Sequence, residues 1–201
     1  MSSTVDEAAA ALRSGRVAIV PTDTVYGLAA DPELLDAVRE LSHLKRRAES
    51  QPIALVGADF EQLVARIPEL QGRSATIVGA LLPGPYTLVL PNPAGHYGWL
   101  AGSQQRTIGI RIPELGGVAR ELFEQVGALA ATSANLTGEA DPRTLDDVPV
   151  ELRSAAAALL DAGPLPGTPS TVLDFTGAEP GILREGAASG VEALRIVASV
   201  L

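Results

Sequence analysis

The fold is decided by the stretch Pro21-Thr22-Asp23-Thr24-Val25-Tyr26-Gly27-Leu28, where an apolar run over residues 17–20 gives way to hydroxyl-bearing side chains. Proline cannot continue a central strand, so we expect the strand over 17–20 to leave the sheet there. Gly27 permits a backbone angle or a close approach that a side chain would forbid. We interpret the stretch as a strand end that opens into a pocket. The alternative is an ordinary strand-to-loop exit in which Thr and Asp satisfy the turn.

Length and composition restrict the class of protein. A chain of 201 residues can bury a substantial core, and we expect one compact domain over residues 1–201. Hydrophobic residues make up 46% of the chain and charged residues 19%, which favours a globular protein over a disordered one. No apolar run is long enough to span a bilayer, and the N-terminus lacks the basic and apolar regions of a signal peptide. We therefore expect a cytoplasmic protein.

The chain has no cysteine and only two histidines, His43 and His96, which are far apart in the sequence. Disulfides, thiolate nucleophiles and Cys- or His-rich metal sites are therefore excluded. The formal net charge of −9 predicts a surface that repels nucleic acid and anionic membranes. Any site for an anion must be local, and the single lysine, Lys45, lies in the densest basic cluster of the chain.

Apolar periodicity predicts helices and strands that alternate along the chain. Asp31 and Pro32 have the pattern of an N-cap followed by the first helical residue. An alternating strand over 107–113 would place Thr107, Gly109 and Arg111 on one face. We expect helices over 4–14, 31–44, 59–66, 73–82, 116–126 and 151–162, strands over 17–20, 53–56, 86–90, 107–113, 128–131 and 172–175, and either structure over 191–201. This order is typical of an α/β protein with helices packed around a mostly buried sheet.

Small oxygen-bearing side chains and isolated cations follow several of these elements. They are Thr22, Arg111, Ser133, Asn135, Ser170 and Arg184, together with Lys45 and Arg47 after the helix over 31–44. Hydroxyls, amides and cations suit a polyanion better than a proton-transfer reaction. The alternative for residues 45–47 is a charged last turn that favours the helix dipole. The chain has no Walker loop and no Gly-x-Gly-x-x-Gly motif, so a nucleotide would be held by side chains from scattered elements.

In order and spacing, these residues resemble the YrdC family over residues 8–187. The matching motifs are Pro-Thr-Asp-Thr-Val-Tyr-Gly-Leu at 21–28, Lys-Arg-Arg at 45–47, Pro-Gly-Pro-Tyr-Thr-Leu at 83–88, Gly-Ile-Arg-Ile-Pro at 109–113, Ser-Ala-Asn at 133–135, Ser-Thr-Val at 170–172 and Leu-Arg-Glu-Gly at 183–186. The resemblance implies a single YrdC-like domain, with a twisted mixed sheet, surrounding helices and a concave cleft.

The resemblance also implies an activity, that of a threonylcarbamoyl-AMP synthase. Such an enzyme condenses L-threonine, bicarbonate and ATP and releases pyrophosphate. Its product supplies the threonylcarbamoyl group for an adenosine beside the tRNA anticodon, so downstream transfer proteins are the expected partners. Mg²⁺ would be held mainly by the ATP phosphates, without a metal site on the protein.

A role for each matching residue follows from the same resemblance. Thr22 and Ser170 would hold the substrate threonine, with Arg111 near its carboxylate or the phosphates. Lys45 and Arg47 would be catalytic and would contact the phosphates of ATP. The further contacts to ATP would be Thr107, Ser133, Asn135 and Arg184. Tyr26 would lie at the pocket wall, as a packing residue.

Two positions depart from the family pattern. Ala48 stands where proline usually follows Lys-x-Arg, and Asp141-Pro142-Arg143 stands where Ser-Pro-Thr is usual. We expect the first change to loosen the loop that carries Arg47, and the second to place a charge of each sign near the mouth of the nucleotide site.

Two alternative functions are also compatible with the resemblance. One is an RNA-binding YrdC-like paralogue without synthase activity, which would use the basic cluster over 39–47; the net charge of −9 and the scarcity of aromatic residues argue against an extensive RNA surface. The other is a carbamoyl-transfer domain of the kind fused into hydrogenase-maturation proteins, which carry additional domains.

Overall fold

Residues 21–28 form the turn of a β-hairpin, with the strand ends on either side of it, in the computed structural model, which describes residues 2–201. β1 (Ala18–Pro21) pairs antiparallel with β2 (Tyr26–Ala30), and Pro21 lies opposite Tyr26. The first strand ends at the proline, as predicted. The second strand was not predicted, because all five of its residues are buried and the polar–apolar alternation that marks a half-buried strand is missing.

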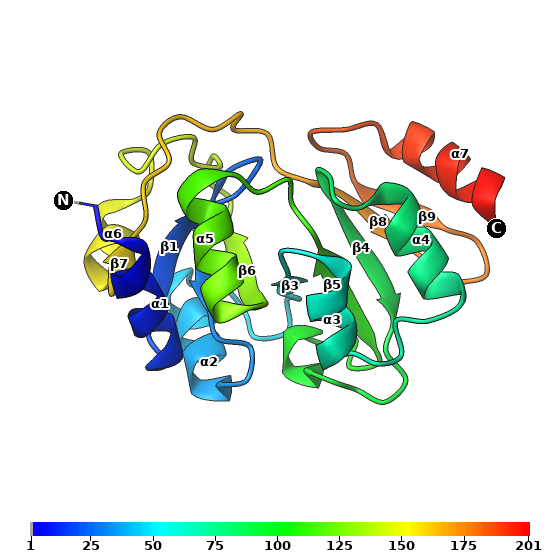
Figure 1. Cartoon of the computed structure of the whole chain (residues 1–201), viewed down its shortest axis with the longest axis horizontal. Coiled ribbons are helices and arrows are strands. Elements are labelled where there is room, and N and C mark those ends of the chain that lie inside the picture. Colours follow the sequence, from blue (N-terminus) through cyan, green and yellow to red (C-terminus); the bar gives the residue numbers. More distant parts are fainter. Residues whose placement is uncertain (1) are drawn as a thin grey trace.

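Nine strands form a single mixed sheet in the order β7-β1-β2-β6-β3-β5-β4-β8-β9. The remaining strands are β3 (Ala54–Val56), β4 (Tyr86–Pro91), β5 (Thr107–Arg111), β6 (Leu129–Ser133), β7 (Ala158–Leu159), β8 (Thr171–Asp174) and β9 (Gly181–Arg184). The connection from β7 to β8, residues 160–170, crosses from one edge of the sheet to its other half and runs along the top of Figure 1. We call it the crossing segment. The predicted α/β class with a mixed sheet is confirmed.

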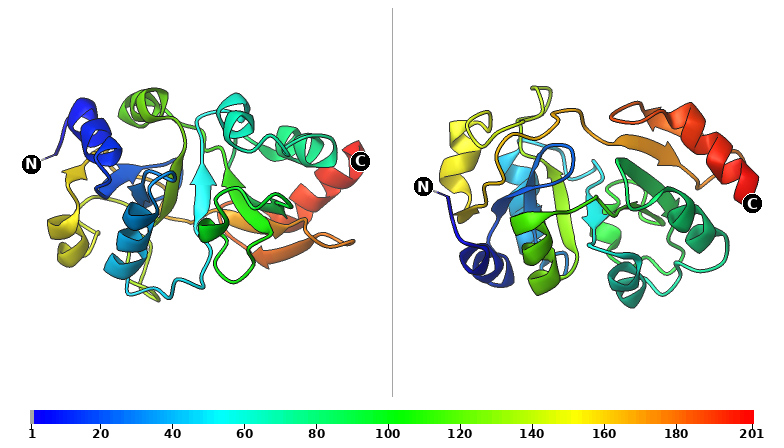
Figure 2. Two further views of the ribbon diagram at one scale, coloured as in Figure 1. Left: turned by 90° about the horizontal axis from the view of Figure 1, so that it is seen from below. Right: turned by 45° about the horizontal axis from the view of Figure 1, so that its top comes forward.

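The helices cover the sheet unevenly. α1 (Val5–Arg13) and α5 (Gly117–Val126) stand together over one half, whereas α3 (Phe60–Arg66) and α4 (Arg73–Leu81) stand over the other, with β3 between the two groups (Figures 1 and 2). The other helices are α2 (Leu35–Leu44), α6 (Val150–Ala155), α7 (Gly190–Val200) and the 3₁₀ turn η1 (Gly98–Leu100). Residues of α1 and α5 form one apolar cluster with β1, β6 and β7, and the larger apolar cluster includes residues of α2, α3, α4, α6 and α7.

Several predicted helix and strand ends agree with the structure to within two residues. α1 begins with a capping box in which Thr4 accepts from the backbone of Glu7, and Asp59 caps α3 through the backbone of Gln62. The undecided tail is helical, as α7. Among residues 2–201, no helix combines the length and the apolar character that crossing a bilayer requires.

Two predicted helices were wrong at one end. α2 begins at Leu35, because Asp31 closes a turn through the backbone of Glu33 instead of capping the helix. α6 ends at Ala155, although the sequence remains rich in alanine. The next residues turn to the sheet edge instead, where the Ala157 N–H donates to the Val17 carbonyl over 2.8 Å.

Candidate active site

Small residues on neighbouring strands leave the middle of the sheet hollow. Gly27 of β2, Ala131 of β6, Ala54 of β3 and Gly109 of β5 line one cavity of 320 Å³. Small residues lie side by side there: Ala54 lies opposite Ala131, and a Cβ atom on Gly109 would come within 3.8 Å of the Ala54 backbone. The residues that line the cavity belong to strands and loops. The cavity lies beside the part of the sheet that α1 and α5 cover. Its volume is within the range of small-molecule sites, about 300–1,000 Å³.

Seven of the nine predicted site residues line this cavity: Thr22, Arg47, Thr107, Arg111, Ser133, Ser170 and Arg184. They come from the hairpin loop, the loop after α2, the ends of β5, β6 and β9, and the residue before β8. Residues separated by up to 162 positions in the sequence, from 22 to 184, therefore meet at one site. The other two, Lys45 and Asn135, lie behind Ser133.

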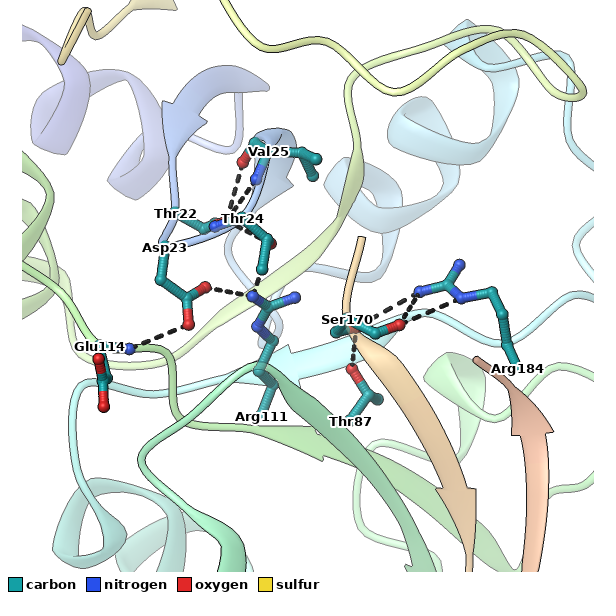
Figure 3. Close-up of polar contacts among 9 residues, drawn as sticks. All are labelled: Thr22, Asp23, Thr24, Val25, Thr87, Arg111, Glu114, Ser170 and Arg184. Atoms are coloured by element: carbon teal, nitrogen blue, oxygen red, sulfur yellow. Dashed lines mark hydrogen bonds and ion pairs between the residues drawn. The ribbon is translucent and has the colours of Figure 1, made fainter. Parts of the chain in front are cut away.

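The hairpin loop and Arg111 are joined by hydrogen bonds (Figure 3). Arg111 Nη2 pairs with Asp23 Oδ1 and donates to Thr24 Oγ1 over 2.7 Å. Thr22 Oγ1 accepts from the N–H of Val25 over 3.3 Å and donates to the carbonyl of that residue over 2.8 Å, which closes the loop on itself. The Arg111 side chain is thus fixed on the side that faces the hairpin.

A second polar group lies across the cavity from Arg111, around Ser170 (Figure 3). Ser170 Oγ lies 2.8 Å from Thr87 Oγ1, and Arg184 Nη2 donates to the Ser170 carbonyl over 2.8 Å. Val172 of β8 pairs with Arg184 of β9, so sheet pairing brings this arginine to the serine. The Ser170 hydroxyl is therefore held by a side chain from each neighbouring strand.

Three guanidinium groups, those of Arg47, Arg111 and Arg184, line the cavity. Burial lowers the pKa of Arg47, and the nearby charge of Arg184 lowers it further. Burial also lowers the pKa of Arg111, an effect that Asp23 opposes. The Nε atoms of Arg47 and Arg111 are buried and have no hydrogen-bond partner in the described chain. The three cations that converge on the cavity indicate a site for an anion that carries several charges.

Lys45 lies at the C-cap of α2 and is 3% exposed. Its Nζ donates to the Ser133 carbonyl and, over 3.0 Å, to Asn135 Oδ1. Ser133 Oγ also donates to Asn135 Oδ1, over 2.6 Å. Burial, and next the charge of Arg47, lower the pKa of Lys45 to about 8, although the charge of Asp141 raises it. The ammonium therefore holds the end of β6 in shape from behind the cavity wall.

Comparison with known protein families shows which family the chain belongs to. A family model covering Sua5, YciO and YrdC, described as "Telomere recombination", matches residues 10–186. The chain belongs to this family. Two of its curated relatives are called threonylcarbamoyl-AMP synthase. The Bacillus subtilis protein is 33% identical over 184 residues, which is 90% of this chain and 53% of that protein. The Vibrio vulnificus protein is 32% identical over 162 residues, which is 80% of this chain and 87% of that protein.

Solved structures of the Sua5/YciO/YrdC family have the same fold. Sua5 of Pyrococcus abyssi, solved in complex with L-threonine, matches with a TM-score of 0.87 and 30% identity over 98% of this chain. The present chain spans 58% of the length of that protein. YciO of Escherichia coli matches with a TM-score of 0.83 at 23% identity, which supports the fold alone.

The sequence analysis missed several polar residues of the site, among them Ser103 and Gln104 in the cavity lining and Thr24 beside Arg111. Asp23 pairs with Arg111, Thr87 touches Ser170, and Thr132 Oγ1 accepts from Arg47 Nη1 over 3.0 Å. Asp23 and Thr87 belong to motifs that the family resemblance already contained, so their position beside predicted ligands was the available signal. For Thr132 the only signal was its place immediately before Ser133.

The prediction for Tyr26 needs correction, whereas the prediction that Asp141 and Arg143 lie near the mouth of the nucleotide site stays a prediction. Tyr26 is fully buried and does not line the cavity; its hydroxyl donates to Asp161 Oδ1 and the Gly163 carbonyl and accepts from the Ala162 N–H. Arg143 is not among the residues that line the cavity; its Nε donates to the carbonyl of Leu165 in the crossing segment. Asp141 also lies outside the cavity lining, close enough for its charge to act on Lys45.

The residues present do not form a metal site of their own. No group of three or more His, Cys, Asp or Glu side chains that could hold a metal ion occurs within residues 2–201. Asp23, the carboxylate beside the cavity, is already paired with Arg111. The residues around the cavity therefore do not fit a resident Mg²⁺. That Mg²⁺ enters the cavity bound to the nucleotide phosphates stays a prediction.

Proposed function

We propose that this protein is an L-threonylcarbamoyl-AMP synthase, which condenses L-threonine, bicarbonate and ATP to threonylcarbamoyl-AMP and pyrophosphate. One observation carries the proposal: three guanidinium groups and the Thr22, Thr87 and Ser170 hydroxyls converge on one cavity. Relatives that align over most of the chain are called by this activity, and a relative of the same fold binds L-threonine. ATP is the substrate that supplies the polyanion.

The geometry suggests how the residues divide the two substrates. Thr22 and Ser170 are proposed to hold threonine. The Thr22 hydroxyl, which already donates to the Val25 carbonyl, would accept from the hydroxyl of threonine, whereas the Ser170 hydroxyl could donate to its carboxylate. Arg111 would bind the carboxylate or a phosphate with the guanidinium donors that Asp23 and Thr24 leave free. The proposed ATP contacts are Arg47, Thr107, Ser133 and Arg184, with Lys45 and Asn135 acting through Ser133 as long as the ammonium stays in its present position.

The proposed chemistry is adenylyl transfer by positioning. The threonine amine first combines with bicarbonate, with loss of water, to give a carbamate. A carbamate oxygen then forms a bond to the α-phosphorus of ATP, while the bond to pyrophosphate breaks and takes its electron pair to the leaving group. The cavity arginines would stabilise the charge that develops on the phosphates. A protein base is not needed for this second step, because the carbamate is already an anion.

A pyrophosphate-release assay tests the proposal. Purified protein is incubated with ATP, bicarbonate and L-threonine, and each of the last two is omitted in turn, with CO₂-depleted buffer for the bicarbonate omission. The proposal predicts release that requires both. Release with ATP alone would indicate a simple pyrophosphohydrolase. No release, combined with salt-sensitive retention of RNA, would support the RNA-binding alternative and refute the synthase.

A further inference from the structure

We propose that Asp23 is a positioning residue that aims Arg111 into the cavity and supplies the counter-charge for its three guanidinium groups. The kinetic part of this proposal rests on the proposed function, whereas its electrostatic part does not.

The contacts of Asp23 fix one side of the Arg111 guanidinium. Asp23 Oδ1 accepts from Arg111 Nη2, and Asp23 Oδ2 accepts from the Glu114 N–H over 3.2 Å. Thr24 Oγ1 accepts from the same Nη2. Nε is buried without a partner in the described chain, whereas Nη1 makes no hydrogen bond there and is not buried, so Nη1 is the free donor that Arg111 can offer to a ligand in the cavity. The side chains of Arg111 and Asp23 are 9% and 11% exposed, so water screens the pair poorly.

The charge balance around the cavity makes Asp23 unlike an ordinary turn residue. The charged side chains that line the cavity are those of Arg47, Arg111 and Arg184, and no carboxylate lines it within residues 2–201. In the described structure, the one ion pair made by any of these three arginines joins Arg111 to Asp23. Without it, three cations would face one another with no anion bound.

These two roles have opposite effects on an anionic ligand. As a counter-charge, Asp23 weakens the attraction of the cavity for phosphates, which favours release of pyrophosphate. As an anchor, it keeps Arg111 in the orientation that the reaction needs. Removing the charge should therefore tighten pyrophosphate binding and slow turnover. If Asp23 only held the turn in shape, removing its charge would weaken pyrophosphate binding and also slow turnover.

The test compares Asp23→Asn with Glu114→Gln. The first keeps the shape of the side chain but removes its charge and one acceptor. The second removes one negative charge from an exposed side chain nearby and leaves the Glu114 N–H in place. Titration calorimetry with inorganic pyrophosphate at low ionic strength measures binding without catalysis, and pyrophosphate release measures turnover. Thermal melting checks that each variant folds.

For Asp23→Asn we expect pyrophosphate to bind at least about 3-fold more tightly and kcat to fall at least about 10-fold, with Glu114→Gln close to wild type in both. Unchanged or weaker pyrophosphate binding in a folded Asp23→Asn protein would overturn the counter-charge role. Unchanged kcat would overturn the positioning role.

A double-variant cycle keeps the electrostatic claim testable even if the proposed reaction is wrong. Asp23→Asn should lower the melting temperature by at least about 6 °C when Arg111 is present, since it leaves a buried charge unpaired. In an Arg111→Met background the same change should have less than half of that effect. Equal shifts in both backgrounds would refute the pairing, whatever the assay of turnover shows.

Discussion

At the scale of single residues, Lys45 combines burial with a charge. Its ammonium is surrounded by oxygen atoms of Ser133 and Asn135, and its pKa is lowered to about 8, chiefly by burial. In the proposed synthase, a charged Lys45 would support the cavity wall that faces the phosphates. Activity should therefore depend on whether this one group keeps its proton.

We predict that kcat/KM falls as the pH rises through about 8, because Lys45 of the free protein then loses its charge. Lys45→Arg should lose this alkaline limb, since a guanidinium stays protonated. The stability of the protein should rise with pH between about 8 and 10.5. In this range the unfolded chain still holds the Lys45 proton, whose ordinary pKa is 10.5, and the folded chain does not. Activity and melting temperature measured across this range check both signs.

Lys45→Ala removes the ammonium altogether, and turnover should fall at least about 100-fold. Arg39→Ala, in an exposed side chain on the same helix, is the matched control and should leave turnover unchanged. An alkaline limb that persists in Lys45→Arg, or wild-type turnover in Lys45→Ala, would contradict the role given to this residue.

Thr87 allows a sharper test of the threonine half of the site. Thr87→Val keeps the shape of the side chain but removes the hydroxyl that lies 2.8 Å from Ser170 Oγ. We expect KM for threonine to rise about 10-fold, the effect of losing one hydrogen bond in a buried polar group, while KM for ATP changes little. Thr76→Val, at an exposed position of α4, is the control. A rise confined to the KM for ATP would place Ser170 at the nucleotide instead.

The sequence predicted most site residues because each is a polar side chain at a strand end or helix end. It could not predict that Thr22 Oγ1 is already bonded to Val25, or that Lys45 lies behind the cavity wall. Such details depend on side-chain contacts between residues far apart in the chain, and a single sequence contains no direct signal for them.

At the scale of elements, the crossing segment connects the two halves of the sheet. Tyr26 fixes its beginning through Asp161, Ala162 and Gly163, and the Gly167 N–H donates to the Thr24 carbonyl over 2.8 Å. The segment ends at Ser170, which lines the cavity. Burial, the largest cause, raises the pKa of Tyr26 to about 12, so the hydroxyl stays neutral and keeps donating at ordinary pH.

Tyr26→Phe should lower the free energy of unfolding by about 1–3 kcal/mol, because the Ala162 N–H, Asp161 Oδ1 and the Gly163 carbonyl lose the hydroxyl that they bond. Tyr86→Phe is the matched control, since no side-chain hydrogen bond of Tyr86 occurs in the described structure. Denaturant unfolding measures the difference. Equal stability of the two variants would show that Tyr26 does not fasten the crossing segment.

Element prediction failed where pairing with the sheet overrode local preference. Residues after Ala155 have high helix propensity, yet β7 forms because its backbone completes the edge beside β1. β2 was missed because both of its faces are buried. The elements with a clear amphipathic period or a side-chain cap, such as α1 and α3, were predicted closely.

At the scale of the whole molecule, the net charge of −9 contrasts with a cavity lined by three arginines. The sheet explains how both occur, since its strand order brings three arginines that are far apart in the sequence to one cavity. Composition could predict that an anion site must be local, but not where. The location follows from the strand order, which places the ends of β2, β6, β3, β5, β4 and β8 side by side.

The most direct measurement is a crystal structure of the protein with L-threonine and a non-hydrolysable ATP analogue. We predict phosphate oxygens within hydrogen-bonding distance of Arg47 and Arg184, and an amino acid beside Thr22 and Ser170, in the one cavity. Density for the nucleotide anywhere else on the protein, or for the two ligands in separate sites, would contradict the account.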